Sequence, residues 1–191
     1  MLKSKATLTA AAFVLSVSGV ARASTVVVGG LAGECSTLAK AGHSDPESIE
    51  TCTRALASGP LSNHDLAGTY VNRGSMEFHN EDYPAAHKDF QAALAVMPTM
   101  GEAHIGEGAY LIYQEKFPEA QAEIDRGLQL GAEEPEKGYY FRALARWGQN
   151  DLKGAYLDFQ KASDLKPGWD LPRKQIAKFH VEPASAAAPT P

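Results

Sequence analysis

One pattern of small and large residues occurs three times in the middle of this 191-residue chain, at intervals of 34 and then 35 residues. Its clearest marker is a small residue: Gly74 in the first copy, Gly108 in the second and Ala143 in the third. A period of this length is typical of helix pairs that stack side by side, because each pair buries its apolar face only against its neighbours. The sequence therefore predicts an all-α fold, a short α-solenoid of antiparallel helix pairs.

Each copy is expected to form two helices. In the first copy, the spacing of Gly74 and Phe78 predicts one helix, and the spacing of Ala86, Phe90 and Ala93 predicts a second. Small side chains at these phases let two helix backbones approach closely, and the larger ones fill the space between pairs. The residues expected to pack the repeats together are Gly74, Ala86, Phe90, Ala93, Gly108, Ala120, Ile124, Gly127, Ala143, Ala155, Phe159 and Ala162.

These positions resemble the tetratricopeptide repeat (TPR) family, in which small residues recur at fixed positions of a unit of about 34 residues. The resemblance covers residues 67–169, about half of the chain, with repeats at 67–100, 101–134 and 136–169. It implies a binding scaffold whose concave face is lined by the first helix of each repeat. Position 7 of the unit departs from the family, because the usual leucine is replaced by arginine, glutamate and arginine in the three copies.

This departure at position 7 is matched by a second change, sixteen residues later. An aspartate stands there in the first and third repeats, whereas the second repeat has Glu107 and Glu123 at the two positions. The joint change predicts an ion pair inside the first and third repeats; two solvated charges are the alternative, since exposed pairs contribute only about 0–1 kcal/mol. The expected pairs are Arg73 with Asp89 and Arg142 with Asp158.

The first residues predict export. Residues 1–23 have the three parts of a signal peptide: lysines at positions 3 and 5, an uncharged run, and a small-x-small cleavage site that ends at Ala23. The run is shorter than the about 20 apolar residues of a membrane-spanning helix. Cleavage removes three basic residues, which takes the net charge from −5 to −8. We expect an exported protein, periplasmic or secreted, with a flexible arm at 24–33 and no stable membrane insertion after cleavage.

The predicted export determines how the two cysteines are interpreted. Cys35 and Cys52 each lie on the apolar stripe of a predicted helix, and Ser44 and Glu47 form a capping box at the start of the second helix. In an oxidising compartment such a pair is expected to form a disulfide, which would stabilise the fold by about 3 kcal/mol; two buried free thiols are the alternative. Residues 34–58 therefore read as a degenerate, disulfide-stapled opening repeat.

The chain continues after the third repeat. Residues 170–181 predict one more helix, which we expect to cap the last open helix pair. Residues 183–191, with the sequence Pro-Ala-Ser-Ala-Ala-Ala-Pro-Thr-Pro, have almost nothing to bury and are expected to be disordered.

The sequence carries no motif of catalysis. None of the six histidines stands near another histidine, a cysteine or a carboxylate at a metal-site spacing such as H-E-x-x-H. A G-x-S-x-G motif and a phosphate-binding glycine loop are absent from the sequence. The net charge is −5, so the sequence lacks the excess of basic residues that is typical of nucleic-acid-binding proteins. We therefore expect no enzymatic activity, no cofactor, no metal site and no nucleic-acid partner.

Function is expected in the concave groove of the repeats. The resemblance selects the lining residues Val71, Ser75, Phe78, His79, Ile105, Ala109, Ile112, Tyr113, Tyr140, Leu144 and Trp147. Some family members hold a chain-end carboxylate with a lysine and an asparagine, but the matching positions here are apolar or small. The expected function is thus an adaptor of the cell envelope that binds an apolar or aromatic segment of a protein or peptide. The alternative is a self-associating structural protein, whose groove is filled by its own termini or by another copy.

The signal and cysteine patterns make a joint prediction for the exported protein. It should begin near Ser24 and contain one bridge between Cys35 and Cys52, which intact-mass analysis with and without a reductant measures. Two thiols that react with an alkylating agent before reduction would contradict the bridge.

Overall fold

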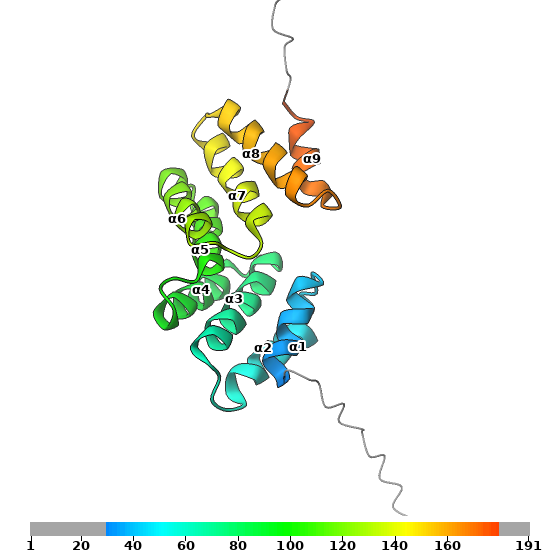
Figure 1. Cartoon of the computed structure of the whole chain (residues 1–191), viewed down its shortest axis with the longest axis vertical. Helices are drawn as coiled ribbons and strands as arrows, with labels where there is room; N and C mark the ends of the chain where they lie inside the picture. Colours follow the sequence, from blue (N-terminus) through cyan, green and yellow to red (C-terminus); the bar gives the residue numbers. More distant parts are fainter. Residues whose placement is uncertain (1–29, 180–191) are drawn as a thin grey trace, which may run out of the picture.

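The computed structural model describes residues 30–179, which fold as helices running in antiparallel pairs along a curved path (Figure 1). The helices of this part are α1 (Gly30–Lys40), α2 (Pro46–Ala57), α3 (Asn63–His79), α4 (Tyr83–Val96), α5 (Gly101–Tyr113), α6 (Phe117–Gln129), α7 (Pro135–Gly148), α8 (Leu152–Leu165) and α9 (Asp170–Ile176). The expected all-α solenoid is confirmed: three helix pairs, α3–α4, α5–α6 and α7–α8, stand between an N-terminal hairpin and a short C-terminal helix.

Several boundaries differ from those expected from the sequence. Residues 30–33 belong to α1 and not to a flexible arm, because packing of α1 on α2 and α3 outweighs the low helix propensity of glycine. The N-cap of α2 is Asp45 and not Ser44, since the Asp45 carboxylate accepts from the amides of Glu47 and Ser48 at 3.1 Å. Helix α3 begins at Asn63, before the expected repeat. The signal segment 1–23, residues 24–29 of the arm and the tail 183–191 lie outside the described residues.

The turn inside each repeat has the same backbone conformation in all three copies. Glu81, Glu115 and Asn150 have positive φ angles of 64°, 58° and 63°. In each case the next amide donates back to a carbonyl of the last helical turn, as Asp82 N does to Glu77 O at 2.9 Å. This arrangement satisfies carbonyls that the helix end would leave free, so it fixes the angle between the two helices of a repeat.

Small residues form the contacts between helices. All twelve residues expected to pack the repeats are buried in the structure. The sequence offers no reason for Gly106, and the structure supplies one: a Cβ atom there would lie 2.5 Å from the ring of Phe90, which belongs to the preceding repeat and is 2% exposed. The two repeats therefore come together with an aromatic ring lying directly on the backbone of α5.

A disulfide closes the N-terminal hairpin. Cys35 and Cys52 are bonded, with 4.9 Å between their Cα atoms, and both are fully buried. Met76 of α3 lies against this bridge, with its sulfur 3.8 Å from Cys52 Sγ. The bridge thus belongs to the contact between the hairpin and the first repeat.

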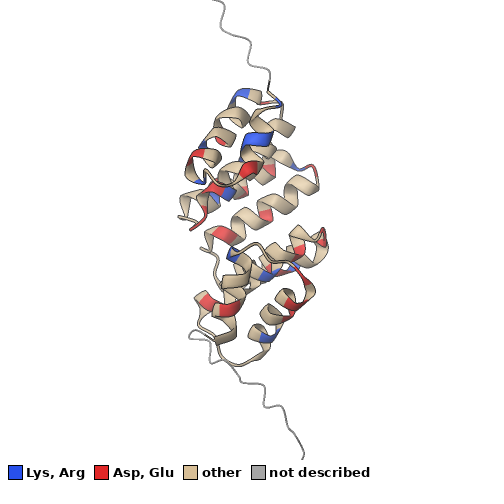
Figure 2. Cartoon of the chain, turned by 90° about the vertical axis from the view of Figure 1, so that its right-hand side faces the viewer, with Lys and Arg blue, Asp and Glu red and all other residues tan. Residues whose placement is uncertain are grey.

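Buried ion pairs join the helices of the first and third repeats. Arg73 binds Asp89 through two hydrogen bonds of 2.7 and 2.8 Å, and Arg142 binds Asp158 through two of 2.8 Å. Both aspartates are almost completely buried, and their hydrogen bonds raise the pKa of each guanidinium. Arg142 also reaches Asp125 of α6 at 2.7 Å, so this pair links two repeats. Figure 2 shows acidic and basic residues interspersed along the helices.

Replacing Gly106 with alanine should destabilise the protein. Overpacking against Phe90 costs about 1–3 kcal/mol, and it outweighs the gain of about 1 kcal/mol from the higher helix propensity of alanine. Urea unfolding measures the difference, with Gly168→Ala as the control, because a Cβ at Gly168 meets nothing within 4 Å. A Gly106→Ala variant as stable as the control would show that the Phe90 ring moves aside freely.

Candidate protein-binding groove

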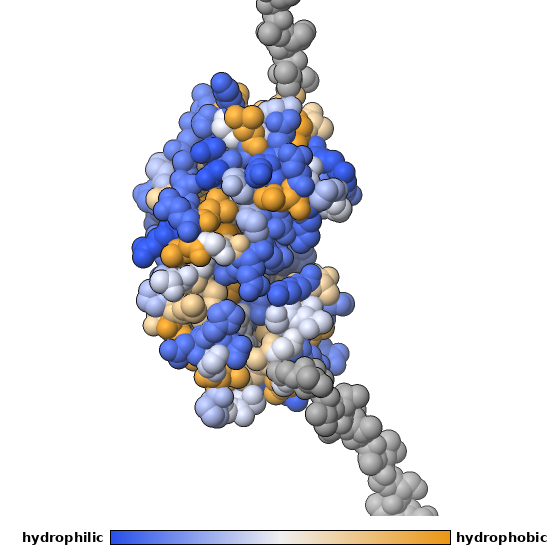
Figure 3. Space-filling view, in the orientation of Figure 1, coloured by the Kyte–Doolittle hydropathy of each residue, from blue (hydrophilic) through white to orange (hydrophobic). Residues whose placement is uncertain are grey.

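The concave side of the solenoid holds a cavity of about 700 Å³. Its walls come from the C-terminal end of α1 and from α3, α5 and α7, which are the first helices of successive pairs. Apolar side chains make its floor: Val71, Met76, Met100, Ile105 and Tyr140. On the face shown in Figure 3, hydrophobic areas are small and separated by hydrophilic residues.

Seven of the eleven residues expected in the groove line this cavity. They are Val71, Ser75, Phe78, His79, Ile105, Ala109 and Tyr140. Only Ser75 and His79 are well exposed, whereas Val71, Ile105, Ala109 and Tyr140 keep less than a tenth of their surface accessible. The apolar floor is therefore packed into the repeats, and much of the accessible lining is polar.

The other four residues lie elsewhere. Ile112 and Tyr113 do not line the cavity, and the Tyr113 ring stacks at 3.9 Å on Tyr83 with half of its surface exposed. Leu144 and Trp147 belong to the core formed by α7, α8 and the residues around α9. Their expected place in the groove was wrong, because the segment around α9 covers the last repeat and Trp147 packs on Phe179 at 5.1 Å.

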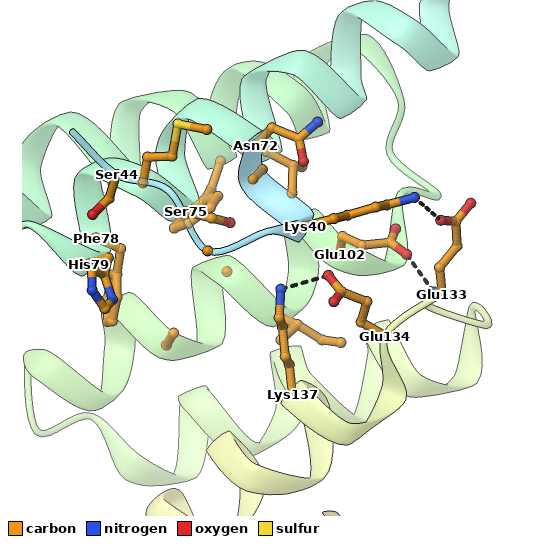
Figure 4. A pocket seen from close by; sticks show the side chains of 18 of the residues that line it. Lys40, Ser44, Asn72, Ser75, Phe78, His79, Glu102, Glu133, Glu134 and Lys137 are labelled. Carbon is orange, nitrogen blue, oxygen red and sulfur yellow. Dashed lines mark hydrogen bonds and ion pairs between the residues drawn. The ribbon is translucent and has the colours of Figure 1, made fainter. Parts of the chain in front are cut away.

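A charged rim borders the cavity, and the repeat pattern did not reveal it. Lys40 reaches Glu133 at 3.5 Å, the Glu133 amide donates to Glu102 at 2.5 Å, and Lys137 donates to Glu134 at 2.6 Å (Figure 4). These residues come from α1, α5, α7 and the loop between α6 and α7. Lys40 lies outside the repeats, so only the curvature of the solenoid brings it to Glu133.

The loop after α1 closes one side of the cavity. It is held at one end by Lys40 and Glu133, and at the other by Asn80, whose side-chain amide donates to the Ser44 carbonyl at 2.6 Å. Lys40 and Glu133 are each more than half exposed, and such a pair contributes at most about 1 kcal/mol. The N-terminal hairpin, which packs firmly on α3, thus reaches across the groove to the α6–α7 loop through one weak contact with Glu133.

Two further polar groups, Lys166 and Tyr140, line the cavity. Lys166 donates to Glu136 at 3.0 Å, and this hydrogen bond raises the pKa of the lysine. Burial raises the pKa of the Tyr140 hydroxyl. Across residues 30–179 no group of three or more metal-type side chains comes together, and none of the helices there has the length and apolar character to cross a bilayer.

The comparisons with known proteins find this fold in solved structures. The first TPR domain of human RPAP3 is similar over 61% of this chain and 91% of that domain, with 19% identity and a TM-score of 0.53. The second TPR domain of human RPAP3, solved in complex with the HSP70 peptide SGPTIEEVD, is similar over 61% of this chain and 97% of that domain. The identity is 20% and the TM-score is 0.51. MamA from Desulfovibrio magneticus RS-1 is similar over 78% of this chain and 84% of the MamA chain, with 18% identity and a TM-score of 0.52. No protein-family model and no curated protein matches the sequence.

The placement of Trp147 changes what its substitution should do. Trp147→Ala should lower the free energy of unfolding by about 2–4 kcal/mol, because it removes a ring packed on Phe159 and Phe179. Ser75→Ala, in the cavity, should change it by less than about 0.5 kcal/mol. Chemical denaturation of both variants tests the assignment. A Trp147→Ala protein of wild-type stability would return this residue to the list of groove candidates.

Proposed function

We propose that this chain, which has the tetratricopeptide-repeat fold, is a non-enzymatic interaction scaffold that binds a segment of another protein in its concave cavity. The observation that carries the proposal is the cavity itself, with an apolar floor and a rim of charged groups supplied by four different parts of the chain. Concave apolar sites with a few convergent polar groups are where proteins bind ligands.

Two solved structures with this fold contain a bound peptide. The second TPR domain of human RPAP3 was solved with an HSP70 peptide, and the first TPR of Spaghetti (RPAP3) with the HSP90 peptide SRMEEVD. Both peptides end in Glu-Glu-Val-Asp. Here the rim lysines Lys40 and Lys137 are already paired with Glu133 and Glu134, so they would hold such an acidic end less well than unpaired basic groups. We therefore favour a partner segment whose apolar or aromatic side chain enters the cavity while its backbone meets the polar rim.

The cell envelope or the extracellular space is the proposed location. The support is the signal-peptide pattern of residues 1–23 together with the disulfide of the N-terminal hairpin, since disulfides persist in oxidising compartments.

Self-association is the second candidate. The form of this alternative in which the chain fills its own groove is supported by the loop after α1 at one end of the cavity and by Trp169 and Leu171 at the other. The measured mass of the protein at micromolar concentration separates the two functions, because a monomer favours the adaptor and a stable oligomer favours self-association.

A peptide selection tests the proposed function. Peptides selected from a random library on the immobilised protein should be rich in apolar or aromatic residues. Ser75→Arg, which places a long charged side chain in the cavity, should weaken their binding at least about tenfold in fluorescence anisotropy. The control is Gln91→Arg, at an exposed position of α4 away from the cavity lining. Equal affinity of the two variants would place the binding surface elsewhere, and selected peptides with acidic ends would overturn the partner class.

A further inference from the structure

The second repeat replaces the arginine–aspartate pair of its neighbours with two histidine–glutamate contacts. His87 Nδ1 of α4 lies 2.9 Å from a carboxylate oxygen of Glu107 of α5. His104 Nδ1 of α5 lies 2.7 Å from a carboxylate oxygen of Glu123 of α6. Helix α5 is thus tied to the helix on each side of it by a histidine–glutamate pair, and the two glutamates stand where the other repeats have arginine and aspartate. The imidazole of each pair can change its charge near neutral pH.

Both ring nitrogens of His104 lie against oxygen atoms. Its second ring nitrogen, Nε2, lies 3.0 Å from the backbone carbonyl of Pro98, and only 4% of the residue is exposed. A carbonyl oxygen accepts hydrogen bonds and never donates, and an ionised carboxylate does the same. A neutral imidazole carries one N–H and satisfies only one of the two contacts. Both contacts can be hydrogen bonds at the same time only when one additional proton is bound. That proton is carried either by the second ring nitrogen of His104 or by the Glu123 carboxylate.

We propose that His104 and Glu123 form a proton-linked joint, which fastens α5 to α6 and to the turn after α4 when protonated and loosens when the proton is lost. The groups that face this joint are the Pro98 carbonyl, and Glu107 with its partner His87. Helix α5 carries one wall of the cavity. Acidification therefore tightens that wall and alkalinisation loosens it.

Two other carboxyl groups also make the fold less stable as the pH rises. An experiment therefore has to distinguish their effect on stability from that of the joint. Burial raises the pKa of Glu107, opposed by His87. Burial, followed by the nearby charge of Asp89, raises the pKa of Glu77 from 4.5 to about 7. A carboxyl group with a raised folded-state pKa stabilises the fold below the unfolded value, and this stabilisation is lost as the pH rises through the folded value. Wild-type stability should therefore fall from about pH 5 to pH 8, with the joint as one contributor.

Glu123→Gln isolates the contribution of the joint. A glutamine amide can donate to Nδ1 of a neutral ring while Nε2–H still donates to Pro98, so the contact no longer needs the extra proton. The control is Glu119→Gln, which removes one carboxylate from an exposed position of the same helix. Between pH 5.5 and pH 8.0, the folding equilibrium constant of the wild type and of the control should fall about tenfold more than that of Glu123→Gln. This difference corresponds to the release of one proton over about one pH unit.

Two measurements decide the proposal without the partner protein. Urea unfolding at both pH values gives the equilibrium constants, and nitrogen NMR of the His104 ring at pH 7.0 should show hydrogens on both nitrogens in the wild type and on one in Glu123→Gln. The same fall in stability for Glu123→Gln as for the control would overturn the proposal. So would a wild-type His104 ring with one bare nitrogen at pH 7.0.

Discussion

Backbone contact at small residues sets the spacing of the helices in this solenoid. A Cβ at Gly108 would lie 3.0 Å from the carbonyl of Ala120, and one at Gly127 would lie 2.5 Å from the carbonyl of Gly101. Interiors are packed closely enough that one added methyl group is felt, so these positions determine how near the two helices of a repeat stand.

The tight spacing also decides what remains of the concave face. Successive first helices come close enough for Phe78 of the first repeat to meet Phe141 of the third, with ring centroids 6.1 Å apart. Side chains of the groove floor are therefore packed against one another, and the concave face keeps a bounded cavity with a charged rim. Such a site suits an apolar side chain or a short segment better than a long helix laid along an open groove.

The second repeat is held differently from its neighbours. Helix α5 meets α4 at Gly106 and α6 at Gly108, two residues of low helix propensity, and histidine–glutamate contacts tie it to both of these helices. A guanidinium stays charged at every physiological pH, whereas an imidazole changes its charge in that range. The proposed joint of His104 and Glu123 thus lies in the middle of the solenoid, on the helix that carries one wall of the cavity.

The sequence by itself determined the features that repeat along the chain: the helix pairs, the small residues at their crossings, and the Arg73–Asp89 spacing of an intra-repeat pair. These follow from the period of the helix and of the unit, which are local properties. Only the tertiary structure decided which groove candidates stay accessible, why Gly106 is glycine, and how Lys40 meets Glu133 across 93 residues of sequence. Those contacts join segments outside the repeat phase, and they depend on the curvature that accumulates when all the units are stacked.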